Sequence, residues 1–362
     1  LNPVVMSKLY PVGVQNFEKV ILGGYEYVDK TALIYQLFNT GSYYFLSRPR
    51  RFGKSLLLST LEAYAQGKKE LFKGLALEKL EKDWTVYPVL HLDLNTQKYD
   101  TPESLTSILN DNLCIWESRY GARESETSLS LRFQGIIRRA CEQTGRRVVI
   151  LIDEYDKPML QAIGNEALQN EYRSTLKAFY GALKSMDGCI RFALLTGVTK
   201  FGKVSVFSDL NNLMDISMDD RYVEICGISE KEIHTYFEED IHALATATGL
   251  TYEETCAELK SNYDGYHFTE NAVGMYNPFS LLNTFAKKKF GSYWFETGTP
   301  TYLVELLKLH HYPIEELEHI VTSQPVLDSI DTASTDPIPV IYQSGYLTIK
   351  GYNKMFENYT LG

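Results

Sequence analysis

A glycine, a lysine and a serine at the start of a predicted helix are the first residues whose spacing suggests a chemistry. The segment from Tyr43 to Leu58 reads YYFLSRPRRFGKSLLL, so an apolar run passes through a polar turn into a leucine-rich stretch. This order of strand, loop and helix is the setting of a phosphate-binding loop. Backbone N–H groups of the turn and of the helix N-terminus can then face the phosphates of a nucleotide.

The side chains of this loop have distinct expected roles. We expect Lys54 to reach the β- and γ-phosphates and the Ser55 hydroxyl to hold Mg²⁺. Arg48 stands where the usual first glycine would be, and because arginine tolerates a left-handed backbone poorly we expect a different turn there. The predicted nucleotide-binding residues are Arg50, Arg51, Phe52, Gly53, Lys54, Ser55, Leu56 and, from a later strand, Thr196.

Two adjacent acids supply the second half of the predicted site. The apolar run from Val148 to Ile152 suits a strand buried on both faces, and it ends in Asp153 and Glu154. We expect Asp153 to join Ser55 in the Mg²⁺ shell. The predicted catalytic residues are Glu154 and Lys54, and Glu154 would polarise the attacking water. Either motif alone also fits a turn or a helix cap. Their order and context together predict a nucleotide site.

Composition limits the class of protein. The chain has 362 residues, a net charge of −10 and 44% hydrophobic residues, as expected of a globular protein with two domains or with one large domain and an appendage. The charge disfavours a surface that is basic throughout, although it permits a local basic patch. We see no apolar run of the ~20 residues that a membrane span needs, and no signal peptide. Five scattered cysteines disfavour zinc and disulfides, so we expect a cytoplasmic protein, and we expect the chain to be a fragment.

The alternation of strands and helices predicts the elements that position the site. We expect an α/β fold of the P-loop NTPase type, with a parallel sheet and helices on both faces. Its ligand lies at the carboxyl ends of the strands, where Gly53, Asp153 and Thr196 all fall. The predicted strands cover 88–94, 147–153 and 190–196, and the predicted domains are an ATPase domain at 1–227, a helical subdomain at 228–325 and a winged-helix-like module at 326–362.

Several of these segments resemble a known family. SRPRRFGKS, LIDEYDKP, LTGVTKF, YDGYHF and YQSGYL are similar to the predicted AAA-ATPase-like family, found mainly in anaerobic gut bacteria. Arg48 fits that family's own pattern. The resemblance covers nearly the whole chain and implies ATP and Mg²⁺ as ligands and ATP-dependent regulation of an attached effector. Family members usually continue into a nuclease-like domain of the PD-(D/E)XK type, and no nuclease residue can be placed in this chain.

Three functions remain open on the sequence. The first is ATP hydrolysis, the second a nucleotide-binding switch with little or no hydrolysis, and the third a small-molecule kinase. Glu154 favours hydrolysis because it offers a base for water, with Asp93 as the next candidate. Arg48, Arg50 and Arg51 would either clamp the phosphates or pair with acids such as Asp156. Nucleic-acid binding and oligomerisation also remain open, and no membrane contact is expected.

Overall fold

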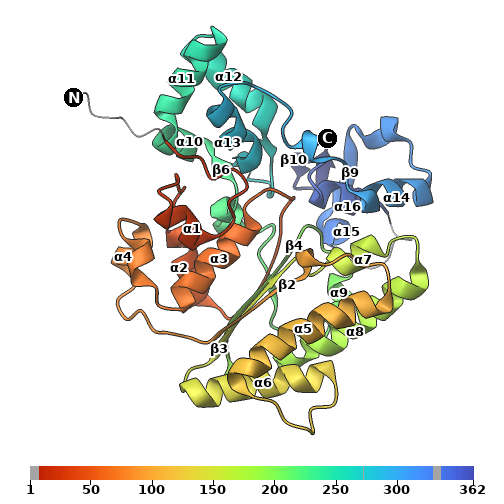
Figure 1. The fold of residues 1–362 in the computed structure, drawn as a ribbon. Helices are drawn as coiled ribbons and strands as arrows, with labels where there is room; N and C mark the ends of the chain where they lie inside the picture. The colour runs from red at the N-terminus through yellow and green to blue at the C-terminus, as the bar shows by residue number, and fades with distance from the viewer. Residues whose placement is uncertain (1–7, 272, 329–335) are drawn as a thin grey trace.

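Five parallel strands form the central sheet of the computed structural model, which describes residues 8–271, 273–328 and 336–362 (Figure 1). The strands are β1 (Tyr43–Ser47), β2 (Val89–Asp93), β3 (Val148–Asp153), β4 (Ile190–Gly197) and β5 (Met214–Asp215). Their order is β2-β3-β4-β1-β5, so β4 lies between the strand that precedes the phosphate loop and the strand that ends in the acids. This sheet confirms the predicted α/β fold of the P-loop NTPase type.

The sheet is buried on both faces. All six residues of β3 are buried, and they alternate between two cores: Ile150 and Ile152 pack on one side, Val149 and Leu151 on the other. A strand covered by helices on both faces has no polar side, which explains its continuous apolar run.

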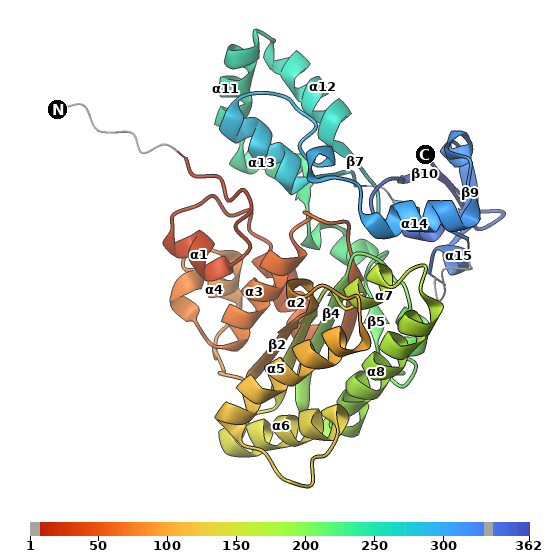
Figure 2. The same cartoon turned by 45° about the vertical axis from the view of Figure 1, so that its right-hand side comes forward.

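Helices cover each face (Figures 1 and 2). On one face lie α5 (Pro102–Tyr120), α6 (Leu129–Thr144), α7 (Lys157–Gln161), α8 (Glu166–Ser185) and α9 (Lys203–Val206). On the other lie α1 (Phe17–Leu22), α2 (Thr31–Thr40), α3 (Lys54–Ala65) and α4 (Ala76–Leu80). Thr101 caps α5 in a capping box and Pro102 opens it, as the sequence predicts.

A helical subdomain with its own core follows the sheet domain. Its helices are α10 (Glu230–Tyr236), α11 (Glu238–Thr248), α12 (Tyr252–Tyr263) and α13 (Pro278–Lys287), and its small antiparallel sheet joins β6 (Ile228–Ser229), β8 (Met275–Tyr276) and β7 (Asp264–Tyr266). Capping boxes form at Ser229 and Thr251, with Glu232 and Glu254 as their partners.

The C-terminal part, which we call the C-terminal module (residues 301–362), has the element order typical of a winged helix. Its elements are α14 (Thr301–His310), β9 (Ile320–Ser323), α15 (Gln324–Asp328), α16 (Ile338–Gln343), β10 (Ile349–Asn353) and β11 (Asn358–Leu361). The antiparallel sheet has the order β10-β11-β9, so a strand before residue 326 pairs with one after it. The predicted domain boundaries at 227 and 326 stay predictions.

Short 3₁₀ turns connect these elements. They are Lys69–Phe72, Leu94–Thr96, Asp187–Cys189, Asp220–Ile225, Phe295–Thr297 and Ile314–Leu317.

The C-terminal module packs directly on the phosphate loop and on the loop after β4. Gly345 lies so close to Pro49 that an added Cβ would come within 2.9 Å of the proline Cβ. The backbone N–H of Lys200 donates to Gln343 Oε1 at 2.6 Å. All six residues of α16 are buried. The candidate nucleotide loop and the end of the chain therefore form one packed unit.

We expect Gly345→Ala to destabilise this packing, because Gly345 has φ 91° and no room for a methyl group. A left-handed alanine costs about 1 kcal/mol or more before the clash with Pro49 is added. The matched control is Gly351→Ala in the same module, where no atom lies within 4 Å of the new Cβ. Thermal unfolding and limited proteolysis should separate the two variants, and equal melting temperatures would contradict the close contact.

Candidate nucleotide-binding site

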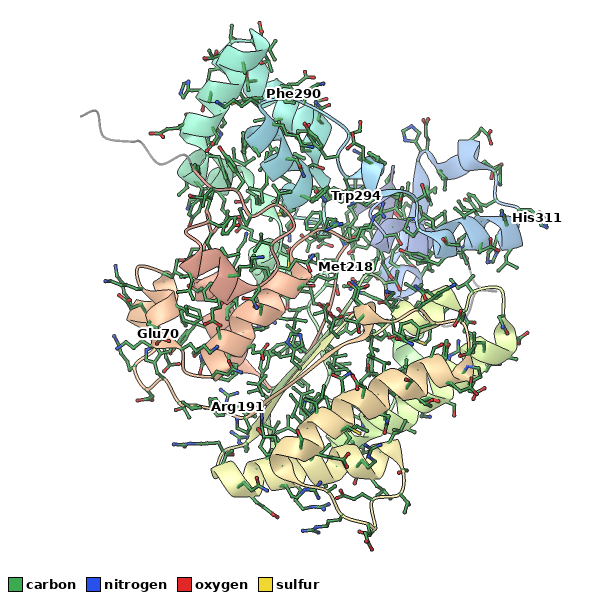
Figure 3. All side chains as sticks on the ribbon, in the orientation of Figure 1. Glu70, Arg191, Met218, Phe290, Trp294 and His311 are labelled. Carbon is green, nitrogen blue, oxygen red and sulfur yellow. The ribbon has the colours of Figure 1, made fainter. Side chains whose placement is uncertain are left out.

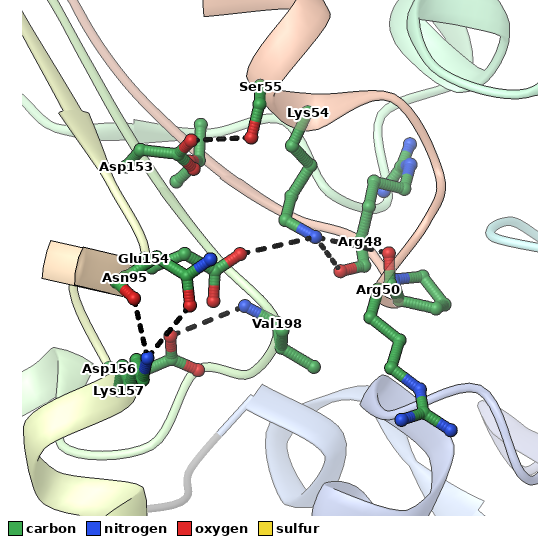
Figure 4. A network of polar contacts seen from close by, with 12 residues as sticks. Arg48, Arg50, Lys54, Ser55, Asn95, Asp153, Glu154, Asp156, Lys157 and Val198 are labelled. Atoms are coloured by element: carbon green, nitrogen blue, oxygen red, sulfur yellow. Dashed lines mark hydrogen bonds and ion pairs between the residues drawn. The ribbon is translucent and has the colours of Figure 1, made fainter. Parts of the chain in front are cut away.

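A short chain of hydrogen bonds joins the ends of β3 and β4 to the start of α3 (Figure 4). The Ser55 hydroxyl donates to Asp153 Oδ2 at 2.7 Å, and the Thr196 hydroxyl donates to Asp153 Oδ1 at 2.9 Å. Asp153 and Thr196 are buried. The parallel sheet thus brings together three residues that the sequence separates widely, because the carboxyl ends of parallel strands meet at one edge.

The phosphate loop turns through two left-handed residues. Gly53 has φ 94° and directly precedes α3, and Arg51 has φ 63°. Nothing lies within 4 Å of a Cβ built on Gly53, so the backbone angle and not crowding favours glycine there. Arg48, at the position of the usual first glycine, is not among the residues with positive φ. The unusual turn expected at Arg48 instead falls at Arg51.

Lys54 lies under the loop and contacts its backbone. Its side chain is 4% exposed, and Nζ donates to the carbonyl oxygens of Arg48 at 2.8 Å and Pro49 at 3.1 Å. The Nζ atom also lies 3.8 Å from Glu154 Oε1. A phosphate that binds in this loop would compete with the two carbonyl groups for the ammonium.

Glu154 has a left-handed backbone conformation and a carboxyl group with a raised pKa. Its φ of 57° is rare for a residue with a side chain, and such strain often marks functional sites. Burial raises the pKa of its carboxyl to about 8; the Lys54 ammonium opposes the shift, and the charges of Asp156 and Asp153 add to it. Burial therefore favours the protonated form of the Glu154 carboxyl in this arrangement of the site.

The three arginines of the loop contact the rest of the chain. Arg48 is 1% exposed, donates to the carbonyl oxygens of Ser47 and Ser217, and lies over the Phe268 ring. Arg50 donates to the Tyr346 hydroxyl and lies over Trp294, and Arg51 lies over Phe279. Figure 4 shows Arg50 directed away from Lys54. The predicted pairing with Asp156 is not what holds them, because that carboxylate has other partners.

Asp156 fixes the loop that follows β4. It accepts hydrogen bonds from the backbone N–H of Val198 and from both the N–H and the hydroxyl of Thr199. Burial raises its pKa even though these hydrogen bonds oppose the shift. The sequence offered Asp156 as a partner of the loop arginines and could not reveal this role, because Val198 and Thr199 lie more than forty positions away.

Asp215 is a second acid that the sequence did not reveal, and it forms ion pairs with two lysines. Lys200 Nζ and Lys203 Nζ lie 2.9 and 2.8 Å from Asp215 Oδ2. Burial opposes ionisation of Asp215, but the two ammonium groups lower its pKa below the ordinary value. An acid within the chain is thus a partner of both lysines. Asp215 lies in a two-residue strand, which is too short to give a sequence pattern.

Phe52 and Leu56 line an apolar cavity beside Gly53. Phe52 is fully buried and packs edge-on against Tyr266 and Phe268. The remaining wall includes Tyr27, Val28, Ile228 and Leu282 from the N-terminal segment and the helical subdomain. An apolar space next to the loop suits the ring of a nucleotide base. Its walls come from distant segments, so no local pattern could reveal it.

The groups at the loop have the chemistry that Mg²⁺ and a nucleotide need. Ser55 and Asp153 offer oxygen ligands 2.7 Å apart, and Mg²⁺ is usually held by one or two such protein groups together with phosphate oxygens. Across residues 8–271, 273–328 and 336–362 no cluster of three or more His, Cys, Asp or Glu side chains could hold a metal by itself. The residues therefore fit a metal that arrives with phosphate.

No helix in the described part of the chain has the length and hydrophobicity to cross a membrane.

Comparison with known proteins identifies the family of this chain. A curated relative from Azotobacter chroococcum mcd 1, named only as an uncharacterized protein in the vnfD 5'region, is 40% identical over 344 residues. That match covers 94% of this chain but 64% of the relative. The family model described as "Predicted AAA-ATPase" matches residues 11–207, and the chain therefore belongs to the predicted AAA-ATPase family.

Proposed function

We propose that this chain binds ATP with Mg²⁺ at the loop 48–55 and hydrolyses it. The observation that carries the proposal is the hydrogen-bonded set of Ser55, Asp153 and Thr196, with Lys54 and Glu154 beside it. A hydroxyl at a helix N-terminus, an acid at a strand end and a neighbouring lysine are the parts that phosphoryl chemistry uses for charge and position.

Each residue has a role that follows from its place. Ser55 and Asp153 would hold Mg²⁺, which when bound neutralises charge on phosphate oxygens. Lys54 would exchange its two carbonyl contacts for phosphate oxygens, and the N-terminal N–H groups of α3 would add further donors. Thr196, whose hydroxyl is bonded to Asp153, would respond to the γ-phosphate. The apolar cavity lined by Phe52 and Leu56 would take the base.

Glu154 is the residue we assign as general base for the attacking water. A base must be deprotonated, and burial favours its protonated form in the present arrangement. Lys54, 3.8 Å away, is the cation that opposes this shift. The raised pKa brings Glu154 closer to neutrality, where a general base accepts a proton from water more readily than an ordinary carboxylate does.

The contacts of the loop after β4 suggest what the nucleotide controls. Thr196 stands at one end of this loop, and the N–H of Lys200 is bonded to Gln343 of the C-terminal module at the other. We propose that ATP and ADP favour different placements of residues 228–362 and so regulate an attached effector. By resemblance that effector would be a nuclease-like domain outside this chain.

A nucleotide-dependent switch with slow hydrolysis is the second candidate. Two features favour it: Lys54 already donates to carbonyl oxygens of its own loop, and burial raises the pKa of Glu154. Both would slow turnover without preventing binding.

We expect Lys54→Ala to weaken ATP binding at least about tenfold, because the phosphates lose their main cation. Isothermal titration calorimetry measures the affinity directly. Lys308→Ala is the matched control, since Lys308 is 69% exposed and lies on α14. Equal affinities of the two variants for ATP would remove the loop from the proposed site.

We expect Glu154→Gln to keep ATP affinity but to lower turnover by about 10²-fold or more, the scale of losing a general base.

In the unaltered protein kcat/KM should rise from about pH 6 to about pH 9, because the pKa of Glu154 is raised to about 8 and the deprotonated form is the active one. Phosphate release measured across this range tests both points. A full rate in the glutamine variant would shift the role to Asp93, and Asp93→Asn would then be the variant to lose activity.

We expect hydrogen exchange to differ between the ATP-analogue and ADP states across residues 196–205 and 228–300. The reason is the Lys200–Gln343 contact, which connects the loop after Thr196 to the C-terminal module. A ligand shifts a conformational balance only by its differential affinity for the two states, so Thr196→Val should reduce the difference. Identical protection in both nucleotide states would leave ATP binding without a switch.

A further inference from the structure

We propose that Cys141 and Cys189 form a reversible disulfide, a modification site at the end of the sheet away from the nucleotide loop. Cys141 lies on α6, and Cys189 ends the 3₁₀ turn Asp187–Cys189 that leads into β4. The two residues are far apart in the chain, so their spacing does not reveal a pair. This inference does not depend on nucleotide binding.

The two thiols lie side by side. The helix α6 and the turn Asp187–Cys189 are in contact, and both cysteines pack against the same hydrophobic core. Burial raises the pKa of the Cys141 thiol, and a hydrogen bond with the Cys189 thiol and the charge of that thiol add to the rise. These effects require neighbouring sulfur atoms, so rotation of the side chains can bring the sulfurs to the ~2.05 Å of a disulfide. Both cysteines are partly exposed, which gives an oxidant access to them.

Two arginines lie beside the pair. The Arg147 guanidinium favours the thiolate of Cys141, against the opposing effects of burial and of the Glu142 charge on its pKa. Arg138 donates to Met186 Sδ at 3.9 Å, directly before the turn. Glutathione carries a net negative charge, so these arginines attract its disulfide to the pair. The oxidant that we assign is therefore an anionic disulfide of low molecular weight.

The reaction consists of two thiol–disulfide exchanges. The thiolate of one cysteine attacks a sulfur atom of oxidised glutathione, forms a mixed disulfide and releases one glutathione thiolate. The thiolate of the other cysteine attacks the protein sulfur atom of this mixed disulfide, closes the bond between Cys141 and Cys189, and releases the second glutathione thiolate. Two protein thiols are oxidised, and one glutathione disulfide is reduced to two thiols. The two protons pass from the protein thiols through water to glutathione.

The bond would tie α6 to the start of two central strands. The turn before β4 also holds the start of β1, because the Tyr43 hydroxyl donates to Asp187 Oδ1 at 2.7 Å. Since β1 and β4 are paired in the sheet, a bond at Cys189 restrains both. Figure 3 shows Arg191, just after Cys189, at the end of the sheet opposite Trp294, which is bonded to the phosphate loop. The disulfide would therefore stabilise the sheet domain away from the nucleotide site.

The test treats the whole chain with oxidised glutathione and analyses its tryptic peptides by mass spectrometry without a reductant. We expect the peptides 140–146 and 185–191 to be linked, with a mass two hydrogen atoms below their sum, and dithiothreitol to separate them. Thiol titration in denaturant should show the loss of two of the five thiols. Unlinked peptides that each carry glutathione, or an unchanged number of thiols, overturn the proposal.

Cys189→Ser should abolish the link, and Cys114→Ser is the matched control that should keep it. Cys114 lies on α5, is exposed, and contacts Asn110 and Arg132. If Cys189→Ser does not fold, Cys141→Ser replaces it. A link that is lost equally in the Cys114 variant overturns the assignment of the pair.

Oxidation should also raise the melting temperature of the unaltered protein by about 4 °C or more, because a disulfide restrains the unfolded chain. The rise should be reversed by dithiothreitol and absent in Cys189→Ser. Equal melting temperatures of the oxidised and reduced unaltered protein overturn the stabilising role of the bond.

Discussion

The carboxylate of Asp153 is the group on which the rest of the site depends. It accepts hydrogen bonds from Ser55 and Thr196 with one oxygen each, so one buried acid ties the first turn of α3 to the end of β4. These two hydrogen bonds require β4 to lie between β1 and β3, which is its position in the sheet. The position of Asp153 thus links the topology of the sheet to the chemistry at its edge.

Negative charge exceeds positive charge at this edge of the sheet. Asp93, Asp153, Glu154 and Asp156 gather there, and Lys54 is the cation in direct contact with one of them. Burial raises the pKa of Asp93 as well as that of Glu154, and the charge of Asp153 adds to both shifts. A divalent cation would relieve this repulsion, since it restores the charge that proton uptake now supplies. Metal binding and the ionisation of Glu154 should therefore be coupled.

Local patterns were enough to predict the elements that carry the site. The continuous apolar run from Val148 to Ile152 predicted the strand that is β3, and the leucine-rich stretch after Gly53 predicted the helix that is α3 (Lys54–Ala65). Partners that are distant in the chain could not be read in this way. Asp215 holds two lysines from a two-residue strand, and Asp156 binds a loop more than forty positions away. Such contacts follow from tertiary packing, which hydrophobic periodicity does not encode.

The arginine-rich loop shows most clearly how tertiary packing changes an interpretation. On sequence alone the three arginines suggested either a clamp for phosphates or pairing with acids, and in the structure Arg48 and Arg50 stack on Phe268 and Trp294. Arg48 is buried and donates to carbonyl oxygens, and burial lowers its pKa. An arginine stacked on an aromatic ring keeps its charge while it packs like an apolar group, which suits a contact between domains. The loop therefore contacts two parts of the chain. Lys54 and Ser55 lie beside the acids of the sheet, and the three arginines contact the segments that follow the sheet. In the proposed function, a change in the nucleotide would therefore act on the same loop that holds the segments following the sheet.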